Sequence, residues 1–253
     1  RLWSFSRTHD ATGDRWLTAK ARRTSAWGIL VFALGVAFAA FDWLMSMDFL
    51  FFSTMWGVYY FAGAAYSGTA LVVFVLATLG LSGKLRDVVT REHFHYLGKL
   101  LFSFTVFWAY IAFSQYFLIW YANLPEETMY MAALKACGWG TLFVILCLGH
   151  FIAPFLILLF REVKKNLRLV RLIAAWMIAM EVADMAWIVR PMVHAGMDQA
   201  SVPGVASWWV DAAAIVGVFG VFGGLLVRKI ASGPLIPLRD PRRHEALAHR
   251  NYI

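Results

Sequence analysis

Six apolar runs, each long enough to cross a lipid bilayer, constrain this sequence more than any other feature. They lie at residues 26–48, 53–81, 98–121, 137–160, 170–190 and 207–228. A helix needs about 20 apolar residues to cross roughly 30 Å of hydrocarbon. Runs such as WGILVFALGVAFAA are apolar on every side, whereas the strands of a membrane barrel are shorter and alternate in polarity. The sequence therefore predicts an all-α integral membrane protein, a bundle of about six transmembrane helices.

The composition excludes several other classes of protein. Hydrophobic residues make up 61% of the chain and charged residues 15%, which is more apolar than a water-soluble domain of this length. The sequence has no phosphate-binding glycine loop, haem-attachment motif, zinc-protease motif or serine-nucleophile motif. Its two cysteines, Cys137 and Cys147, cannot supply a four-cysteine cluster site. We therefore predict that the chain itself binds no cofactor and no metal.

The basic residues are distributed unevenly among the loops. Of the 23 lysines and arginines, 21 flank the bundle or lie in the second-to-third and fourth-to-fifth connections, and only Lys135 and Arg190 lie on the opposite side. Because basic residues in short loops stay in the cytoplasm, both chain ends are predicted to be cytoplasmic. This gives an N-terminal segment (1–25), the bundle (26–230) and a C-terminal tail (231–253). The net charge of +8 is therefore explained by the topology. Nucleic-acid binding is not indicated, because the basic residues are not interleaved with aromatic residues as in a strand-binding groove.

Two acidic residues in the middle of the fifth run are the strongest functional signal. Glu181 and Asp184 are three residues apart, so they share one face of a helix. An ionised side chain in hydrocarbon costs about 2.5–3.5 kcal/mol, and each such residue should face the bundle interior, a polar partner or water. Two carboxylates at this depth cannot both be ionised cheaply, so one is expected to hold a proton. The alternative is that Glu181 pairs with a cation or amide and only holds the bundle together.

His150 lies near the middle of the fourth run, four residues before Pro154. Proline has no N–H, so the carbonyl of His150 is left to bind water or a side chain. A haem ligand is one interpretation of His150, but a membrane b-type haem needs a second histidine at matching depth and no other run has one. Packing or a proton relay is the favoured interpretation.

The remaining acidic residues of the runs give a weaker signal. Asp42, in the first run, is equally consistent with a proton path and with a structural role. Asp48, Asp198 and Asp211 lie near run ends or in a loop, where acidic residues are typically interfacial.

The third run contributes further polar candidates. His93 and His95 stand at the predicted cytoplasmic entry of this run, and Lys99 follows them. Two histidines at this spacing make a poor metal site. A proton-entry role, a subunit-docking role and a plain solvated helix start explain them about equally well. Tyr110 and Gln115 lie farther along this run. For Gln115, an interhelical hydrogen bond is the commoner role.

Several long, irregular motifs resemble one known family. They are FAAFDWLMSMD, FFSTMWGVYY, FSQYFLIWYANLPEE and HFIAPFLILLFREVKKN. These motifs are similar to the F subunit of bacterial alternative complex III, a multi-subunit quinol oxidoreductase, and the likeness covers most of the chain but weakens after Arg190. It corresponds to the C-terminal part of a longer pattern. Since the chain also starts at Arg1 without methionine, we expect further residues upstream.

The resemblance implies a fold, a location and partners. The family is related to the polysulfide-reductase membrane anchors and resides in the bacterial cytoplasmic membrane. Its partners are a paralogous membrane subunit thought to hold the quinol site, an iron–sulfur subunit and haem c subunits, which carry the redox centres. The family's proposed proton path falls here on Asp42, Asp48, His95, Lys99, His150, Glu181 and Asp184.

We expect, on this basis, a subunit without chemistry of its own that supports quinol oxidation and provides a proton route. A purely architectural subunit, an independent secondary transporter and a bundle that binds quinone itself, through Tyr110, Gln115 or His150, are the alternatives. The transporter is disfavoured, because no run shows the paired glycine and proline breaks of discontinuous helices.

Overall fold

The computed structural model of the chain is mostly helical over the residues that it describes, which are 2–85, 88–135, 138–195, 208–236, 239–240 and 243–248. Six helical segments are long and apolar enough to span a membrane, and they are Arg15–Met47, Met55–Leu81, Arg91–Ala122, Trp139–Leu159, Leu167–Met192 and Trp209–Ala231. No strand occurs in these described ranges. The predicted fold class, an all-α membrane protein with about six transmembrane helices, is confirmed, whereas the orientation stays a prediction.

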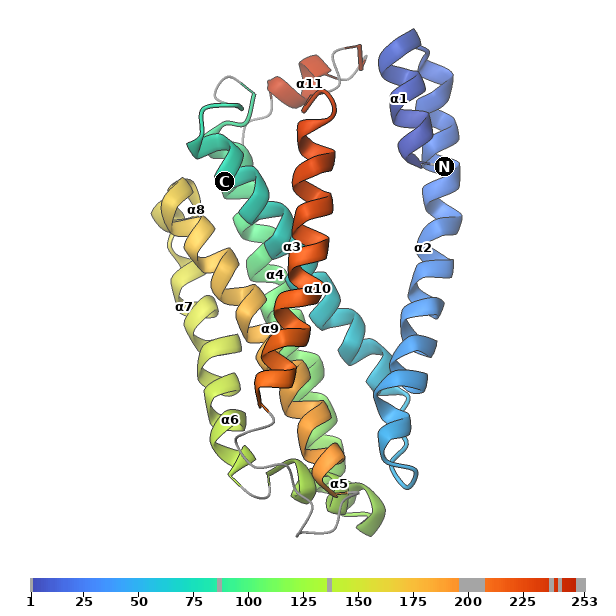
Figure 1. Cartoon of the computed structure of the whole chain (residues 1–253), viewed down its shortest axis with the longest axis vertical. Coiled ribbons are helices and arrows are strands. Elements are labelled where there is room, and N and C mark those ends of the chain that lie inside the picture. Colours follow the sequence, from blue (N-terminus) through green and yellow to red (C-terminus); the bar gives the residue numbers. More distant parts are fainter. Residues whose placement is uncertain are drawn as a thin grey trace. The chain divides into compact units, whose positions relative to one another are not determined.

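The elements follow one another along the chain with short connections. They are α1 (Leu2–Thr12), α2 (Arg15–Trp43), η1 (Met45–Met47), α3 (Met55–Leu81), α4 (Arg91–Ala122), α5 (Pro125–Lys135), α6 (Trp139–Leu146), η2 (Cys147–Ile152), α7 (Ala153–Leu159), α8 (Arg161–Lys165), α9 (Leu167–Ala195), α10 (Trp208–Ala231) and α11 (Arg243–Leu247). Their contacts divide the chain into two units: Arg1–Trp27 with Met197–Ala246, and Gly28–Gly196 with Leu247–Ile253. Figure 1 labels the elements in sequence colours.

The first unit holds α1, the start of α2, α10 and the tail. The backbone N–H of Arg239 donates to Asp10 Oδ1 at 3.0 Å, and its Nη1 donates to the Ala11 carbonyl at 2.6 Å, so the tail contacts α1. Helix α2 begins at Arg15, well before the predicted start of the first span at residue 26. The helix extends into the charged segment because arginine, lysine and alanine are strong helix formers.

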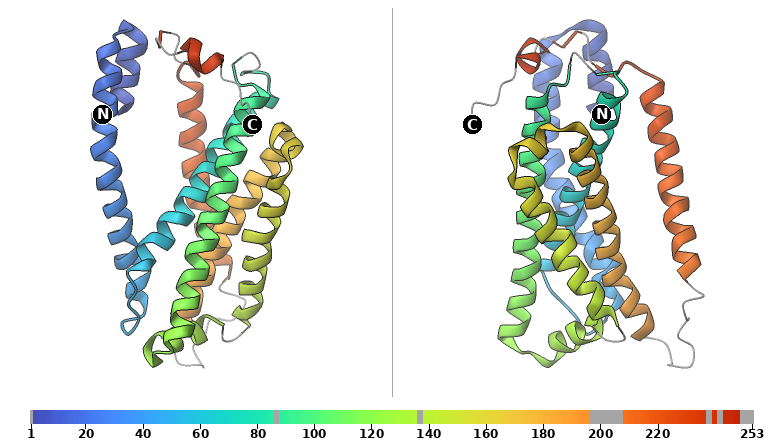
Figure 2. Two further views of the ribbon diagram at one scale, coloured as in Figure 1. Left: turned by 180° about the vertical axis from the view of Figure 1, so that it is seen from behind. Right: turned by 90° about the vertical axis from the view of Figure 1, so that its left-hand side faces the viewer.

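The second unit is built around a four-helix bundle of α3, α4, α9 and the continuous α6–η2–α7 segment (Figures 1 and 2). Each helix buries one stripe of residues at alternating spacings of three and four, the period of knobs-into-holes packing. The stripe of α3 consists of Trp56, Tyr59, Gly63, Tyr66, Ala70, Val73 and Ala77. The stripe of α9 includes Val170, Ala174, Met177, Glu181, Asp184 and Ile188. Both acidic residues therefore occupy core positions.

A π-helical turn, η2, interrupts the helix predicted over residues 137–160. Pro154 has no N–H to offer the carbonyls four and five residues before it. Both carbonyls accept hydrogen bonds from side chains instead: Tyr66 OH donates to the His150 carbonyl at 3.2 Å, and Trp176 Nε1 donates to the Gly149 carbonyl at 2.8 Å. The prediction that proline frees the His150 carbonyl for another donor is confirmed.

Candidate functional site

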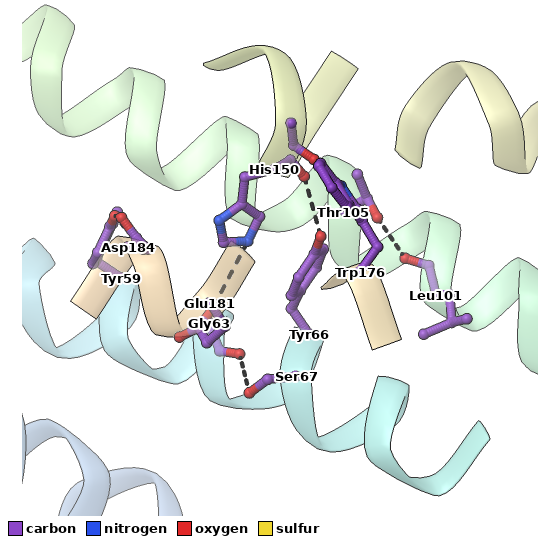
Figure 3. A network of polar contacts seen from close by, with 11 residues as sticks. Tyr59, Gly63, Tyr66, Ser67, Leu101, Thr105, His150, Trp176, Glu181 and Asp184 are labelled. Atoms are coloured by element: carbon purple, nitrogen blue, oxygen red, sulfur yellow. Dashed lines mark hydrogen bonds and ion pairs between the residues drawn. The ribbon is translucent and has the colours of Figure 1, made fainter. Parts of the chain in front are cut away.

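Three titratable side chains meet in the bundle core, His150 from η2 and Glu181 and Asp184 from α9 (Figure 3). One donor atom from each lies within 4.8 Å of the other two. The exposed fractions are 0% for His150, 8% for Glu181 and 1% for Asp184. His150 is 31 positions before Glu181 in the sequence and 34 before Asp184, so only the packing of η2 against α9 brings the histidine to the two acids.

Asp184 is held by a tyrosine of the facing helix. The hydroxyl of Tyr59, on α3, lies 2.7 Å from Asp184 Oδ1 and 2.6 Å from Oδ2, so it donates to the carboxyl group between both oxygens. The Tyr59 ring stacks on Trp56, with centroids 5.3 Å apart and planes at 12°. This packing fixes the phenol and thereby the carboxyl group of Asp184.

Glu181 occupies space that a glycine leaves open. A Cβ atom on Gly63 would lie 2.3 Å from Glu181 Oε1 and 2.9 Å from Cδ, so any larger residue at position 63 would displace the carboxyl group. Glu181 Oε2 points toward His150, and 3.7 Å separates it from His150 Nε2 (Figure 3). This distance is longer than a direct hydrogen bond. A small shift of either side chain would bring the two atoms into hydrogen-bond distance, and a water molecule could bridge them instead.

His150 is oriented by aromatic rings on two sides. The Trp108 ring, from α4, stacks on the imidazole with centroids 3.8 Å apart and planes at 8°, and the Tyr66 ring lies 4.4 Å away at 44°. Neither ring nitrogen of His150 has a hydrogen-bond partner among the described residues, and neither does Glu181 Oε2. Buried polar atoms are rarely left unsatisfied, so these three atoms are suited to exchanging a proton or binding a small polar species.

No lysine or arginine of the described ranges forms an ion pair with Glu181 or Asp184; the one ionic contact of the pair is with His150. The alternative in which a lysine or arginine neutralises Glu181 is therefore wrong for this part of the chain. Two negative charges at this separation in a low-dielectric core repel strongly, and neither is offset by a fixed cation. A proton on the pair removes that repulsion.

The same three groups have the chemistry of a metal-ligand set. Imidazole nitrogens and carboxylate oxygens both serve as ligands in catalytic zinc and iron sites. The sequence analysis predicted no metal because it considered His150 apart from Glu181 and Asp184. The structure brings one ligand atom of each residue within 4.8 Å of the other two, a spacing that could hold a metal ion.

A cavity of about 480 Å³ borders the site between α4, α6, η2 and α9. Asp184 and Tyr59 line one part of it, and both quinone candidates, Tyr110 and Gln115, also line it. Gln115 is buried and its Oε1 accepts a hydrogen bond of 2.9 Å from the hydroxyl of Ser53, in the loop before α3, so this bond joins α4 to a loop and is not the predicted interhelical one. The remaining walls are mostly aromatic and aliphatic.

The other predicted proton-path residues lie apart from this site. Asp42 is exposed on α2. Asp48 instead accepts a hydrogen bond from its own turn. His95 and Lys99 stand in the first turns of α4, and the 13 residues from His95 to Trp108 correspond to about 20 Å of helix. The structure therefore joins His150, Glu181 and Asp184 but leaves the other four predicted path residues outside the site.

Sequence reasoning missed Tyr59, Gly63, Tyr66 and Trp108, which shape the site. The spacing of three of them could have indicated that they act together, because positions 59, 63 and 66 share one face of α3. Only the pairing of this face with α9 reveals their role, and that pairing is not visible in one sequence. Asp198 and Cys137 lie outside the described residues.

No family model matches the chain, and no curated protein matches it either. The fold and the site define a multi-pass helical membrane protein with a buried cluster of one histidine and two acids. The resemblance to the F subunit of alternative complex III stays a prediction.

Proposed function

We propose that the chain is a proton-handling membrane subunit of a bacterial alternative complex III. In this proposal it has no redox centre of its own, both chain ends are cytoplasmic, and haem c and iron–sulfur clusters belong to partner subunits. Quinol is oxidised in a paralogous membrane subunit of the same assembly. The resemblance of four irregular motifs supports this assignment, and so does the helical membrane fold.

The buried trio of His150, Glu181 and Asp184, with no lysine or arginine paired to it in the described ranges, is the observation that carries the proton-handling role. In this environment, an acid pair with one proton bound is more stable than a pair in which both carboxyl groups are ionised. His150, oriented by Trp108, can accept that proton from Glu181 at one nitrogen and release one at the other. Tyr59 holds Asp184 in place and so acts as a positioning residue.

Proton translocation per electron in the purified assembly, reconstituted in proteoliposomes, tests the proposal. Glu181→Gln keeps the shape of the side chain but cannot carry the proton, so the ratio should fall while assembly and haem content stay normal. Glu92→Gln is the matched control, because Glu92 lies in the first turn of α4 and pairs with Lys165 instead. The control should leave the ratio unchanged.

An unchanged ratio in Glu181→Gln would remove the proton-handling role. If the substitution altered only the stability of the assembly in detergent, the architectural subunit would be the correct interpretation. A third outcome is that the trio binds a metal, and metal analysis of the wild-type sample and of Glu181→Gln tests it. Stoichiometric zinc or iron that is present in the wild-type sample and absent from the variant would make the trio a metal site.

The cavity favours a second candidate function, binding of a quinone ring by this chain. Its apolar walls suit a flat ring, while Gln115, Tyr110 and Asp184 place hydrogen-bonding groups along it. Ala112→Phe would fill the cavity from α4, and Val72→Phe, on an exposed face of α3, is the control. A photoreactive quinone should label the wild-type chain and the control but not Ala112→Phe. Absence of labelling in the wild-type chain contradicts this function.

A further inference from the structure

Charged side chains gather at the end of the bundle where α4 begins and α8 connects α7 to α9. The basic members are Lys99 of α4 and Arg161, Lys164 and Lys165 of α8, and the acidic members are Glu92 and Glu162. Four basic and two acidic groups give this cluster a net charge of +2. Helix α8 packs against α4, so the two charged segments form one local surface within the second unit.

Lys164 is the unusual member of this cluster, because its side chain is only 8% exposed. Its stem lies against α4 at Gly98, where a Cβ atom would come within 2.6 Å of Lys164 Cγ. Lysine is seldom buried without a paired charge. In the described ranges, Lys164 Nζ makes no hydrogen bond or ion pair.

Among the described residues, neither carboxylate of the cluster forms an ion pair with Lys164. Glu92 Oε1 pairs with Lys165, and Glu92 Oε2 lies 4.0 Å from His95 Nδ1. Glu162 is exposed on α8. Burial, together with the charge of Lys99, lowers the pKa of the Lys164 ammonium group, as expected for a positive charge that the described residues do not neutralise.

The position of the cluster restricts which kind of anion can neutralise its positive charge. Helix α8 lies between a span that ends at Leu159 and another that begins at Leu167, so it lies where hydrocarbon meets headgroups. Directly before Arg161 stand the exposed apolar residues Leu156, Leu159 and Phe160, with exposed fractions of 51%, 50% and 65%. A ligand with an anionic head and apolar tails matches both surfaces.

We propose that this cluster binds the headgroup phosphate of an acidic phospholipid, whose acyl chains lie along the exposed face of α7. Lys164 is the central contact, and Arg161 and Lys99 flank it. The site is separate from the acid–histidine cluster in the bundle core and does not depend on the proton-handling role.

Lipid retention by the purified assembly tests the site. The assembly is exchanged into mixed micelles of phosphatidylglycerol and phosphatidylcholine, and the lipids that stay bound are counted by native mass spectrometry. Lys164→Met keeps the stem that packs on Gly98 and removes the charge, so bound phosphatidylglycerol should fall about fivefold. Arg161→Gln, at an exposed position that cannot disturb packing, should lower retention in the same direction.

Lys84→Gln is the control, because it removes one exposed basic charge from the α3–α4 connection. It should leave bound phosphatidylglycerol unchanged. Equal retention by the wild-type chain and both α8 variants would overturn the proposal, and so would equal retention of phosphatidylcholine. Displacement of the lipid by millimolar inorganic phosphate would also overturn it, since the site would then recognise a free anion.

Discussion

The core of the bundle and its α4–α8 end both bury charged groups, but they compensate those groups differently. In the core, Glu181 and Asp184 have a histidine and a tyrosine as neighbours. At the α4–α8 end, Glu92 pairs directly with Lys165, and basic groups are in excess. Near the headgroups a counterion is available from the chain or from a lipid, whereas a proton is the smallest species that can neutralise the core pair.

The largest expected effect tests whether the core pair needs the space it occupies. Gly63→Ala places a methyl group where the carboxyl end of Glu181 lies, so this buried side chain must shift, and such overpacking should cost about 1–3 kcal/mol of stability. Gly68→Ala is the control on the same helix, since nothing lies within 4 Å of its Cβ and helix propensity should stabilise it slightly. Thermal unfolding in detergent checks both. Equal effects of the two substitutions would contradict the close contact between Gly63 and Glu181.

The next effect concerns the tyrosine that replaces a counterion in the core. Tyr59→Phe removes the donor to both oxygens of Asp184 and should destabilise the bundle by about 1.5–2 kcal/mol. Tyr60→Phe, at the adjacent half-buried position, should change stability by less than about 0.5 kcal/mol. The same unfolding measurement applies, and a Tyr59→Phe variant as stable as Tyr60→Phe would show that Asp184 does not depend on this hydrogen bond.

One substitution made in both regions sharpens the comparison further. Glu181→Gln relieves an unfavourable acid pair and should leave stability unchanged or raise it by about 1 kcal/mol. Glu92→Gln breaks a partly exposed ion pair and should lower stability slightly, an effect that added salt reduces. If the two variants changed stability in the same direction and by the same amount, the two regions would not differ in how charge is compensated.

The smallest effect is a pH dependence at the α4–α8 end. Without acidic lipid, Lys164→Met removes a poorly compensated charge and should raise the melting temperature by about 1–2 °C near neutral pH. The lowered pKa of Lys164 means that the folded chain loses this proton before an ordinary lysine does. The advantage of Lys164→Met should therefore shrink as pH rises from the lowered pKa toward the ordinary one. An advantage that grows with pH would contradict this sign.

The sequence predicted the spans well, since their apolar runs exceed what any soluble fold contains. Boundaries were less accurate where a helix continues beyond the apolar run. Good helix formers extend α2 back to Arg15, and a capping box of Thr90 and His93 starts α4 at Arg91. The acid pair was visible because Glu181 and Asp184 share one helix. Its contacts with His150, Tyr59 and Gly63 were not visible, because they depend on which helices pack together and at what register.

The central claim is that the carboxyl groups of the core hold a proton, and infrared spectroscopy tests it most directly. The purified wild-type assembly at neutral pH should show the carbonyl-stretch band of a protonated carboxyl group, shifted in heavy water. The band should be missing in the double variant Glu181→Gln with Asp184→Asn and unchanged in Glu92→Gln. A wild-type spectrum with no such band at neutral pH, or a band that survives in the double variant, would contradict the account.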